Sequence, residues 1–357
     1  MHHEIRLMKI AIIVPSLRDL APVRVAVTIG IHLAGKGHEV TIYHFGHHSD
    51  WPGAEGIYFE KISFWSSVPW RKYDIVHSHG FVPDAFVSFR KPFRVQAKTV
   101  STIHNYVFPE LKMLYGWLTS AFIGPAWLIA WFGFDQLVVL TEDAVRYYQS
   151  YFKNKKLTRI YNGRNIIPDL ESISPEHKLL MEAMRDQFKY SIGICSALIK
   201  RKRVDILIRH LSRIETGCLF ILGEGPERRH LEGLVAHLDL NHRVKFLGHV
   251  PQAHLYNFMF DISAHPSSSE GFSLSLIEAA LHKKKIVCSD IPSFREAFNE
   301  TEVTFFESEN EMTIDKAIQD ALRDDDKEGK AFSKAKNEYS EERMAEQYEK
   351  LFTKPVI

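Results

Sequence analysis

The chain has 357 residues, of which 45% are hydrophobic and 25% are charged, and its formal net charge is +1. This length accommodates two domains with separate cores, and the composition excludes a disordered or fibrous protein. The charge is uneven, because residues 1–170 carry a net charge of +6 and residues 171–357 carry −5. The basic half favours an anionic partner for that part of the chain, with a chance distribution of solvated charges as the alternative.

Short apolar runs alternate with helical patterns along the whole chain. In the first half they occupy residues 9–15, 39–45, 56–63, 74–80, 98–105, 136–141 and 157–163, and in the second half 191–197, 218–225, 243–250, 260–267, 285–292 and 303–308. Most are continuously apolar rather than alternating, which is typical of strands covered on both faces of a parallel sheet. We therefore expect an α/β fold with two doubly wound domains.

The domain limits follow from this alternation. We place the first domain at residues 1–168 and the second at 176–336, joined by a linker that contains Pro168 and Pro175. Residues 337–357 have helical spacing and are predicted to pack back toward the first domain. Ligands of open α/β sheets bind outside the carboxyl ends of the strands, so we expect a cleft between the domains.

Residues 113–134 contain no charged side chain, and this length is nominally enough to span a bilayer. The run is interrupted by Gly116, Gly124, Pro125 and Gly133. Three interpretations stay open: a transmembrane helix, a buried pair of helices, and a surface that touches the membrane. Trp117, Trp127 and Trp131 favour the last, because tryptophan concentrates at membrane interfaces.

The cysteines and the amino terminus indicate the compartment. Cys195, Cys218 and Cys288 are too few and too scattered for a disulfide framework or a zinc site. The first apolar run is short and strand-like, so we expect no cleavable signal peptide. The prediction is a cytoplasmic protein, either free or peripheral on the inner face of the cytoplasmic membrane.

A stretch of small residues followed by a helical pattern carries the clearest chemistry. Residues 267–285 read SSSEGFSLSLIEAALHKKK and follow a predicted strand. A loop that leads into a helix aims backbone N–H groups at an anion, and Gly271, Ser273 and Ser275 would let a phosphate approach closely. Glu278 could accept hydrogen bonds from a ribose diol, and Glu270 could accept one from a sugar hydroxyl. The pattern indicates a nucleotide site, with an ordinary capped helix as the alternative.

Two further loops follow predicted strands of the second half. The turn at Gly223 leads into a helix, but Arg228 stands at the third glycine position of the dinucleotide fingerprint, which disfavours NAD. A tight turn with Pro226 at a helix start explains this loop as well as a ligand contact does. Residues 200–203 are four consecutive cations, of which we expect about half to be solvated and the others to face an anion.

The first half offers histidines instead. His77, His79 and His104 are predicted to lie just after strands, on the side where ligands bind, and Ser16 follows the first strand. The three histidines lack the neighbouring ligand pattern of a zinc site. The acidic run at 323–329 is interpreted as a solvated helix end.

The segment PSSSEGFSLSLIEAALHKKKIVCSDIPSFREAF resembles the donor site of the retaining glycosyltransferases of family 4, with their Glu-x7-Glu pair. Further similar motifs are MKIAIIVPS, AGKGHEVTIY, DIVHSHG, TIHN, LVVLTEDA, IYNG, KRVDILI, ILGEGPERRHLE and VKFLGHV, in the family's order. The resemblance implies a GT-B fold of two Rossmann-like domains facing a central cleft, and transfer of a sugar from a nucleotide donor with retention. It implies neither a metal nor a cofactor.

The resemblance also implies roles for single residues. Glu278 would hold the donor ribose, Glu270 would hold the donor sugar, and His104 would lie beside the anomeric carbon. The phosphates would contact Lys202 and Arg201. The remaining predicted donor-site residues are Gly223, Gly271, Phe272, Ser273, Leu274 and Ser275, and the candidates on the acceptor side are His77, His79 and Ser16.

The chain departs from the family pattern at two places. Ala197 stands where an arginine is usual, and Leu20–Ala21 stand where paired glycines are common. The expected reaction is nonetheless sugar transfer, preferably from a UDP-linked donor, to a glycan or lipid-linked acceptor in bacterial surface polysaccharide or lipopolysaccharide synthesis. An anionic membrane surface is a further expected partner, and nucleic acid is not. The alternatives are a nucleotide-sugar epimerase and a non-catalytic nucleotide-sugar-binding subunit.

Overall fold

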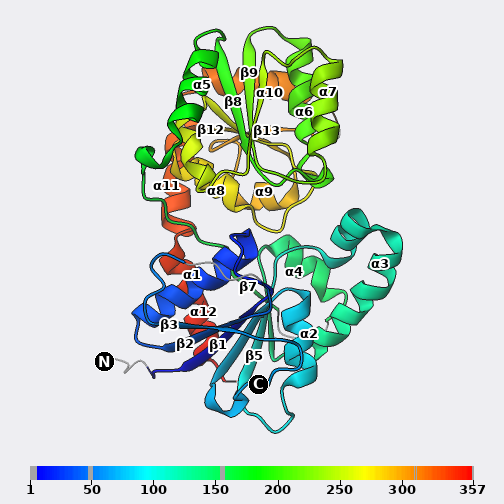
Figure 1. Ribbon diagram of the computed structural model, residues 1–357, viewed down its shortest axis with the longest axis vertical. Coiled ribbons are helices and arrows are strands. Elements are labelled where there is room, and N and C mark those ends of the chain that lie inside the picture. Colours follow the sequence, from blue (N-terminus) through cyan, green and yellow to red (C-terminus); the bar gives the residue numbers. More distant parts are fainter. Residues whose placement is uncertain (1–5, 47–50, 153–156, 309, 311, 356–357) are drawn as a thin grey trace. The chain divides into compact units, whose positions relative to one another are not determined.

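The computed structural model describes residues 6–46, 51–152, 157–308, 310 and 312–355. The chain divides into two compact units (Figure 1). The first unit comprises Met1–Gly163 together with Ser340–Ile357, and the second comprises Arg164–Tyr339. The divisions therefore lie close to the limits that the sequence suggested at 168, 176 and 336.

The first unit is built on a seven-stranded parallel sheet with the order β3-β2-β1-β4-β5-β6-β7. Its strands are β1 (Lys9–Val14), β2 (Glu39–His44), β3 (Ile57–Lys61), β4 (Ile75–His79), β5 (Lys98–Ile103), β6 (Gln136–Val139) and β7 (Leu157–Arg159). The helices are α1 (Ala21–Gly35), α2 (Phe81–Arg90), α3 (Val107–Phe132), α4 (Glu142–Gln149) and α12 (Glu341–Thr353), with a short 3-10 turn η1 (Trp70–Lys72).

The second unit is built on a six-stranded parallel sheet with the order β10-β9-β8-β11-β12-β13. Its strands are β8 (Tyr190–Cys195), β9 (Gly217–Leu222), β10 (Val244–Gly248), β11 (Ile262–His265), β12 (Lys285–Ser289) and β13 (Thr304–Phe306). The α-helices are α5 (Pro175–Arg185), α6 (Val204–Arg213), α7 (Arg228–His237), α8 (Leu274–Leu281), α9 (Pro292–Ala297), α10 (Thr313–Arg323) and α11 (Lys327–Glu338). The 3-10 turns are η2 (Leu170–Ser172), η3 (Lys200–Lys202) and η4 (Ala253–Met259).

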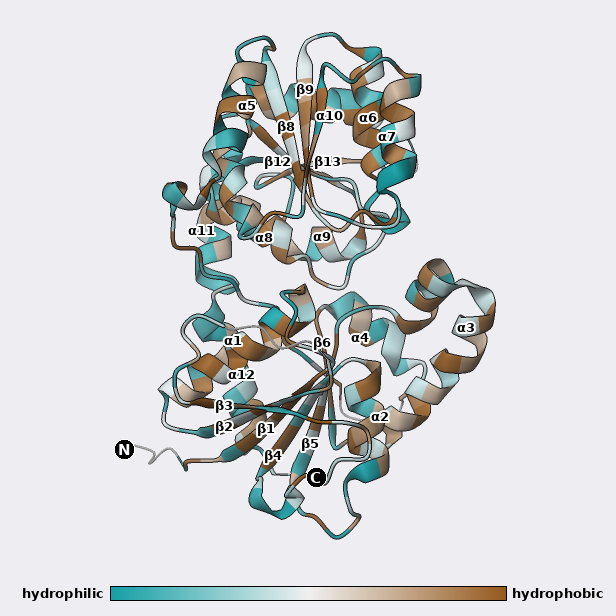
Figure 2. Cartoon of the chain, viewed as in Figure 1, coloured by the Kyte–Doolittle hydropathy of each residue, from teal (hydrophilic) through white to brown (hydrophobic). Residues whose placement is uncertain are grey.

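Every apolar run that the sequence marked as a strand forms one, and the expected doubly wound α/β architecture is confirmed. The central strands are covered on both faces by helices, and they carry the apolar residues of the two cores (Figure 2). In each sheet the strand order reverses between the first strand of the unit and the fourth, that is between β1 and β4 and between β8 and β11. Loops that leave neighbouring strands at such a reversal diverge and form a ligand crevice.

The last helix belongs to the first unit. Met344, Tyr348 and Leu351 of α12 are buried, as their helical spacing predicts, and α12 packs against α1. Glu349 forms an ion pair with Lys36 at 2.6 Å. Residues close to the carboxyl terminus therefore complete the core that the first 163 residues begin.

Residues 113–132 of the uncharged stretch at 113–134 lie in α3, which is two helices rather than one. Gly116 has φ 88° and ψ 171°, so the backbone turns there, and the two limbs pack where Phe108 meets Gly124. The Ser120 hydroxyl donates to the Phe108 carbonyl oxygen at 2.9 Å. Within the described residues, α3 is long and apolar enough to cross a membrane by length and composition, but only 11% of its most apolar window is buried. Of the three interpretations that the sequence left open, the buried pair of helices is half right: the pair exists, but most of it is exposed.

Candidate functional site

The candidate donor site lies at the strand-order reversal of the second unit. The turn η3 follows β8, and the loop 266–273 follows the neighbouring strand β11. The Ser268 amide donates to the Arg201 carbonyl oxygen at 2.8 Å, which joins the two loops. This contact brings together Lys202 and Glu270, which are 68 residues apart in the chain.

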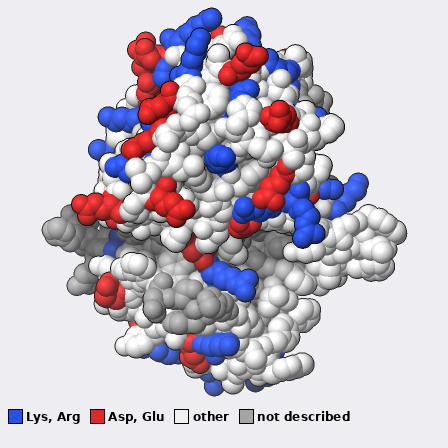
Figure 3. Space-filling view, turned by 45° about the horizontal axis from the view of Figure 1, so that its top comes forward, with Lys and Arg blue, Asp and Glu red and all other residues white. Residues whose placement is uncertain are grey.

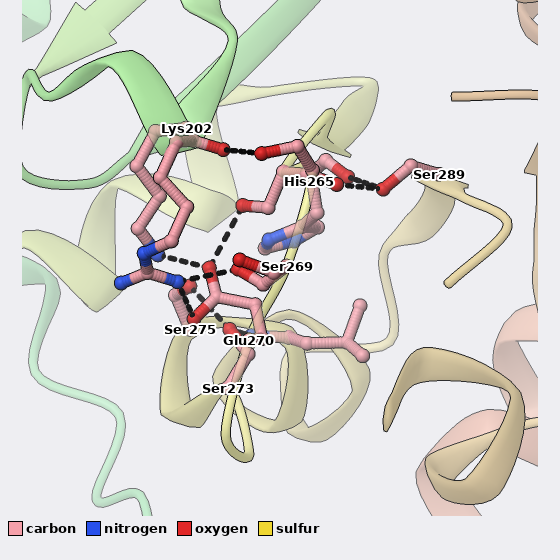
Figure 4. Close-up of polar contacts among 11 residues, drawn as sticks. Lys202, His265, Ser269, Glu270, Ser273, Ser275 and Ser289 are labelled. Atoms are coloured by element: carbon pink, nitrogen blue, oxygen red, sulfur yellow. Dashed lines mark hydrogen bonds and ion pairs between the residues drawn. The ribbon is translucent and has the colours of Figure 1, made fainter. Parts of the chain in front are cut away.

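Glu270 is clamped between two cations (Figure 4). One carboxylate oxygen accepts hydrogen bonds from Lys202 Nζ at 2.6 Å and from the Ser267 hydroxyl at 2.8 Å. The other lies 2.6 Å from Arg201 Nη1, which also donates to the Ser269 carbonyl oxygen at 2.5 Å. The Glu270 residue is only 7% exposed. Burial by itself raises the pKa of this carboxyl, but Lys202 and Arg201 outweigh it and lower the pKa to about 2.

The end of β12 holds the loop that carries Glu270 in place through a hydrogen bond. The Ser289 hydroxyl, at the end of β12, donates to the Ser267 carbonyl oxygen at 2.5 Å. His265 is buried beneath the loop, and burial together with the nearby Lys202 lowers its pKa to about 3. His265 is therefore neutral at physiological pH, and only Lys202 and Arg201 compensate the negative charge of Glu270 within this cluster. Ser267, His265 and Ser289 were not predicted as site residues, although all three lie in expected strand or loop segments.

The next element, α8, presents its amino terminus at the same place. The Ser273 hydroxyl caps the helix by accepting from the Leu276 amide at 3.4 Å, and it lies 3.1 Å from the Ser275 hydroxyl. The amides of Leu274 and Ser275 belong to the first turn, where N–H groups have no acceptor within the helix. The Phe272 ring packs against Tyr339, with ring centroids 5.2 Å apart. A ligand would therefore meet backbone and hydroxyl groups of this segment rather than the Phe272 side chain.

Glu278 lies farther along α8 and has an arginine partner. Arg164 Nε is 2.9 Å from the Glu278 carboxylate, and the two side chains are only 17% and 8% exposed. The Arg164 amide donates to the Tyr339 carbonyl oxygen at 2.8 Å, which ties the two ends of the second unit together. Arg164 was not predicted as a site residue, and its one sequence signal is that of an isolated cation directly after the predicted strand 157–163.

The structure shows a packing reason for Gly223. Its φ is +136°, and a Cβ atom there would lie 1.9 Å from the Ser196 carbonyl oxygen. Gly225 is restricted in the same way by the Leu198 carbonyl oxygen. The turn after β9 thus needs glycines in order to pass over the loop after β8, and a contact of Gly223 with a donor stays a prediction.

The four cations at 200–203 divide into two pairs. Arg201 and Lys202 point to Glu270, so the anion that they face is a carboxylate of the protein. Lys200 is exposed, and Arg203 forms an ion pair with Asp205 at 3.6 Å. Ala197 lies in the same loop, between β8 and η3.

The histidines of the first unit lie together, but not as expected. His77 and His79 are inside β4 rather than after it, while His104 directly follows β5. His79 Nδ1 is 2.9 Å from His104 Nε2, and burial lowers the pKa of His104 to about 4. His77 is buried and lies 2.8 Å from the Thr102 hydroxyl. Strand alternation puts His77 and His79 on one face, so one histidine packs in the core and the other supports His104.

Two other predicted positions of the first unit lie after β1. Ser16 is partly buried, and its hydroxyl lies 3.5 Å from the Arg18 amide. Leu20 is exposed and precedes α1 without a side-chain cap. The structure therefore places Ser16 at the strand-order reversal of the first sheet, where the sequence analysis expected an acceptor-side residue.

Neither the cysteines nor the acidic run at 323–329 forms a further candidate site within the described residues. Cys195, Cys218 and Cys288 are free thiols, and burial raises the pKa of each. The acidic run at 323–329 joins α10 to α11. Within the described ranges, no three His, Cys, Asp or Glu side chains are grouped so that they could hold a metal ion.

Two family models match the chain. Residues 22–166 match "Glycosyltransferase Family 4" and residues 183–339 match "Glycosyl transferases group 1". The O-antigen biosynthesis glycosyltransferase WclY of Escherichia coli is 32% identical over 84% of both chains. An N-acetylgalactosaminyltransferase of Campylobacter jejuni, named for a diphospho-undecaprenol acceptor, is 34% identical over 48% of this chain and 46% of its own.

A solved structure shares the fold. Anabaena Alr3699/HepE, in complex with UDP-glucose, superposes with a TM-score of 0.74 at 18% identity over 97% of this chain and 99% of its own. The two parallel-sheet Rossmann-like units, the match of a family model to each of them and the relationship to WclY lead to one conclusion. The chain belongs to the glycosyltransferases with a family 4 amino-terminal domain and a group 1 carboxyl-terminal domain.

Proposed function

We propose that this protein transfers a sugar from a UDP-linked donor to a lipid-linked glycan acceptor, with retention at the anomeric carbon and without a metal ion. The product would serve bacterial surface polysaccharide synthesis. The observation that carries the proposal is the clamp of Lys202 and Arg201 on Glu270, next to the capped amino terminus of α8.

The clamp suits a nucleotide diphosphate. Two cations and the first-turn amides of α8 offer positive charge to phosphate oxygens from two sides. Without a donor, Glu270 neutralises both cations. A bound diphosphate would share them, which frees carboxylate lone pairs for a sugar hydroxyl. Glu278 is buried on the same helix, and its carboxylate would accept from the ribose diol.

Two relatives and one solved structure also support the proposed function. WclY is named as an enzyme of O-antigen biosynthesis, and the Campylobacter jejuni relative is named for an acceptor with a diphospho-undecaprenol group. The Anabaena structure holds UDP-glucose. These names support a nucleotide-sugar donor and a surface-glycan product for this chain as well.

In the proposed reaction the bond between the anomeric carbon and the β-phosphate oxygen breaks, and an oxocarbenium-like sugar forms. The acceptor hydroxyl attacks the same face, and its proton passes to the departing phosphate. Lys202 and Arg201 stabilise the negative charge that develops on this phosphate. His104, neutral because its pKa is low, would hydrogen-bond the transferred sugar.

The donor site can be tested by thermal unfolding with UDP, GDP, ADP and TDP, each with and without EDTA. Ligand at a hundred times its dissociation constant adds about 2.7 kcal/mol of stability. We expect stabilisation by UDP that is indifferent to EDTA and lost in Lys202→Met and Glu278→Gln. The exposed residues Lys330 and Glu338 of α11 provide matched controls, Lys330→Met and Glu338→Gln. Stabilisation by another nucleotide, or retained UDP binding in both site variants, would contradict the proposal.

Incubation with a UDP-sugar alone separates transfer from the two alternatives. An epimerase converts the donor without an acceptor, and a binding subunit leaves donor and acceptor unchanged. We expect a new glycoside only when a lipid-linked acceptor is added, with the anomeric configuration of the donor, as read by NMR coupling constants.

A further inference from the structure

We propose that the first unit docks on an anionic bilayer through a surface that we call the α2–α3 face. Its apolar members are Phe89, Phe93, Leu114, Tyr115, Trp117, Leu118, Phe122, Ile129 and Phe132, all of them exposed. The inference deepens the proposed function, because it rests on a lipid-linked acceptor and names the surface where that acceptor is met.

The face is apolar to an unusual degree for a water-exposed surface. The exposed fraction is 103% for Phe93, 73% for Phe122 and 67% for Trp117. The limbs of α3 appear largely brown to white (Figure 2), and the lobe that α3 forms at the right edge of the space-filling view is white (Figure 3). Exposed apolar patches of this kind mark an interaction surface.

The base of this lobe is held in place by the core. The indole N–H groups of Trp127 and Trp131 both donate to one oxygen of the buried Asp84, at 2.7 and 2.8 Å. Ser88 of α2 lies against Gly133 at the end of α3, so the two helices are joined there. The lobe is therefore an integral part of the first unit, and its outer side chains are exposed.

The charge around the face fits an anionic surface. Between Asp84 and Asp135 the sequence has a single carboxylate, Glu110, against five cations. Lys98 is buried in β5 and donates to backbone carbonyl oxygens, so four cations remain near the surface: Arg94 and Lys112, which are exposed, and Arg90 and Lys91, which are partly buried. The residues 89–94 read FRKPFR, in which two exposed phenylalanines alternate with cations. Arg90 also lies over the exposed ring of Trp65, with its guanidinium carbon 5.9 Å from the ring centroid. Aromatic side chains mixed with cations bind headgroups and acyl-chain boundaries together.

The bend at Gly116 limits how deeply the α2–α3 face can insert into a bilayer. The longer limb, residues 117–132, spans about 24 Å at 1.5 Å per residue, which is less than the hydrocarbon core of about 30 Å. The other limb returns to the same unit, where Phe108 packs on Gly124. The lobe therefore lies in the interface rather than across the bilayer. A second copy of the chain would cover the exposed apolar side chains of the α2–α3 face. The cations around this face would repel the same cations of that copy, which argues against a dimer.

The test is flotation of the full chain with vesicles of phosphatidylcholine, with and without phosphatidylglycerol, at low and high salt. We expect binding that requires phosphatidylglycerol and weakens with salt. The triple variant Phe93→Ser, Trp117→Ser, Phe122→Ser should lower the partition coefficient about a hundredfold, from the area of three aromatic side chains. The pair Arg94→Glu, Lys112→Glu should lower it at least about tenfold.

Matched controls change exposed residues elsewhere. Tyr58→Ser, Leu170→Ser, Leu179→Ser replaces exposed apolar side chains, and Lys330→Glu, Lys336→Glu reverses exposed cations. Both should leave vesicle binding unchanged. The affinity for UDP, measured on every variant, keeps this inference separate from the proposed donor site: loss of vesicle binding with intact UDP binding supports the docking face.

Two results would overturn the inference. Equal binding of the wild type and the triple variant to anionic vesicles would exclude the α2–α3 face. A wild-type dimer in analytical ultracentrifugation without vesicles, dissociated by the triple variant, would assign the face to a second copy of the chain.

Discussion

At the residue scale, Glu270 keeps its charge inside the second unit because two cations compensate for lost hydration. Lys202 and Arg201 both lie 2.6 Å from its carboxylate, and the Ser267 hydroxyl donates a third contact. A buried charge without such partners would take up a proton instead. Under the proposed function the same cations would bind the diphosphate, so one cluster would both stabilise the donor-free chain and form part of the donor site.

This arrangement predicts a pH dependence of stability. The pKa of Glu270 in the folded chain, about 2, lies below its ordinary value of 4.5. The ionised carboxylate therefore contributes stability that is fully present above about pH 4.5 and is lost as the pH falls through about 2. Glu270→Gln should lower the free energy of unfolding by up to about 3 kcal/mol at neutral pH.

The measurement is urea unfolding of wild type and Glu270→Gln across the acid range. The difference should shrink as the pH falls toward 2 and vanish below it, where the wild-type side chain is protonated and has the shape of glutamine. Glu338→Gln, at an exposed position of α11, should show no such trend. A difference that stays constant with pH would show that the ion pairs add nothing to stability.

At the element scale, α3 depends on one backbone conformation. Gly116 has φ 88° and ψ 171°, a region that is open to glycine and strained for other residues. Apart from its chain neighbours and the adjacent helix backbone, no atom of the described residues lies within 4 Å of a Cβ placed there, so a substitution meets no steric clash. The bend therefore requires a backbone conformation at Gly116 that glycine adopts without strain, and the contacts of Phe108 with Gly124 and Ser120 hold the two limbs together.

Gly116→Ala should therefore destabilise the chain by about 1–3 kcal/mol although the site is open. Gly233→Ala is the matched control, because Gly233 is a helical residue of α7 that also has open space around it. There alanine should stabilise by about 0.5–1 kcal/mol. The check is the midpoint of chemical unfolding for both variants, and effects of the same sign would contradict the assigned bend.

At the scale of the whole molecule, each of the two units has its own hydrophobic core. The first core is closed by α12, whose Phe352 is buried next to His77, while the second contains Leu211 of α6. Each unit has its own parallel sheet and its own helices. Damage to one core should therefore remain local.

Hydrogen exchange with mass spectrometry tests this independence. Phe352→Ala should cost about 3–5 kcal/mol and raise exchange in β1, β4 and β5, with little change in β8 to β12. Leu211→Ala should cost about 2–5 kcal/mol and show the reverse pattern. A uniform rise across both units in either variant would mean that the two cores unfold as one.

The sequence by itself determined the strands, the fold class and the segments that form the candidate donor site. All thirteen apolar runs form strands. Most of these strands are covered on both faces and need continuous apolar residues, which is a local sequence pattern, whereas the edge strand β3 is largely exposed. The loop with Glu270 and the helix with Glu278 could be predicted for a similar reason, because small residues directly before a helix start form a local sequence pattern.

The tertiary structure decided the partners and the exposure. Arg164 reaches Glu278 across 114 residues and Arg201 reaches Glu270 across 69, and no local pattern records such pairs. Trp117 and Trp131 look alike in the sequence, yet one is exposed and the other is buried with its indole N–H on Asp84. His77 lies inside β4 rather than after it, because strand limits depend on pairing with β1 and β5. Pairing, burial and charge compensation are properties of distant segments meeting, so only the folded chain contains them.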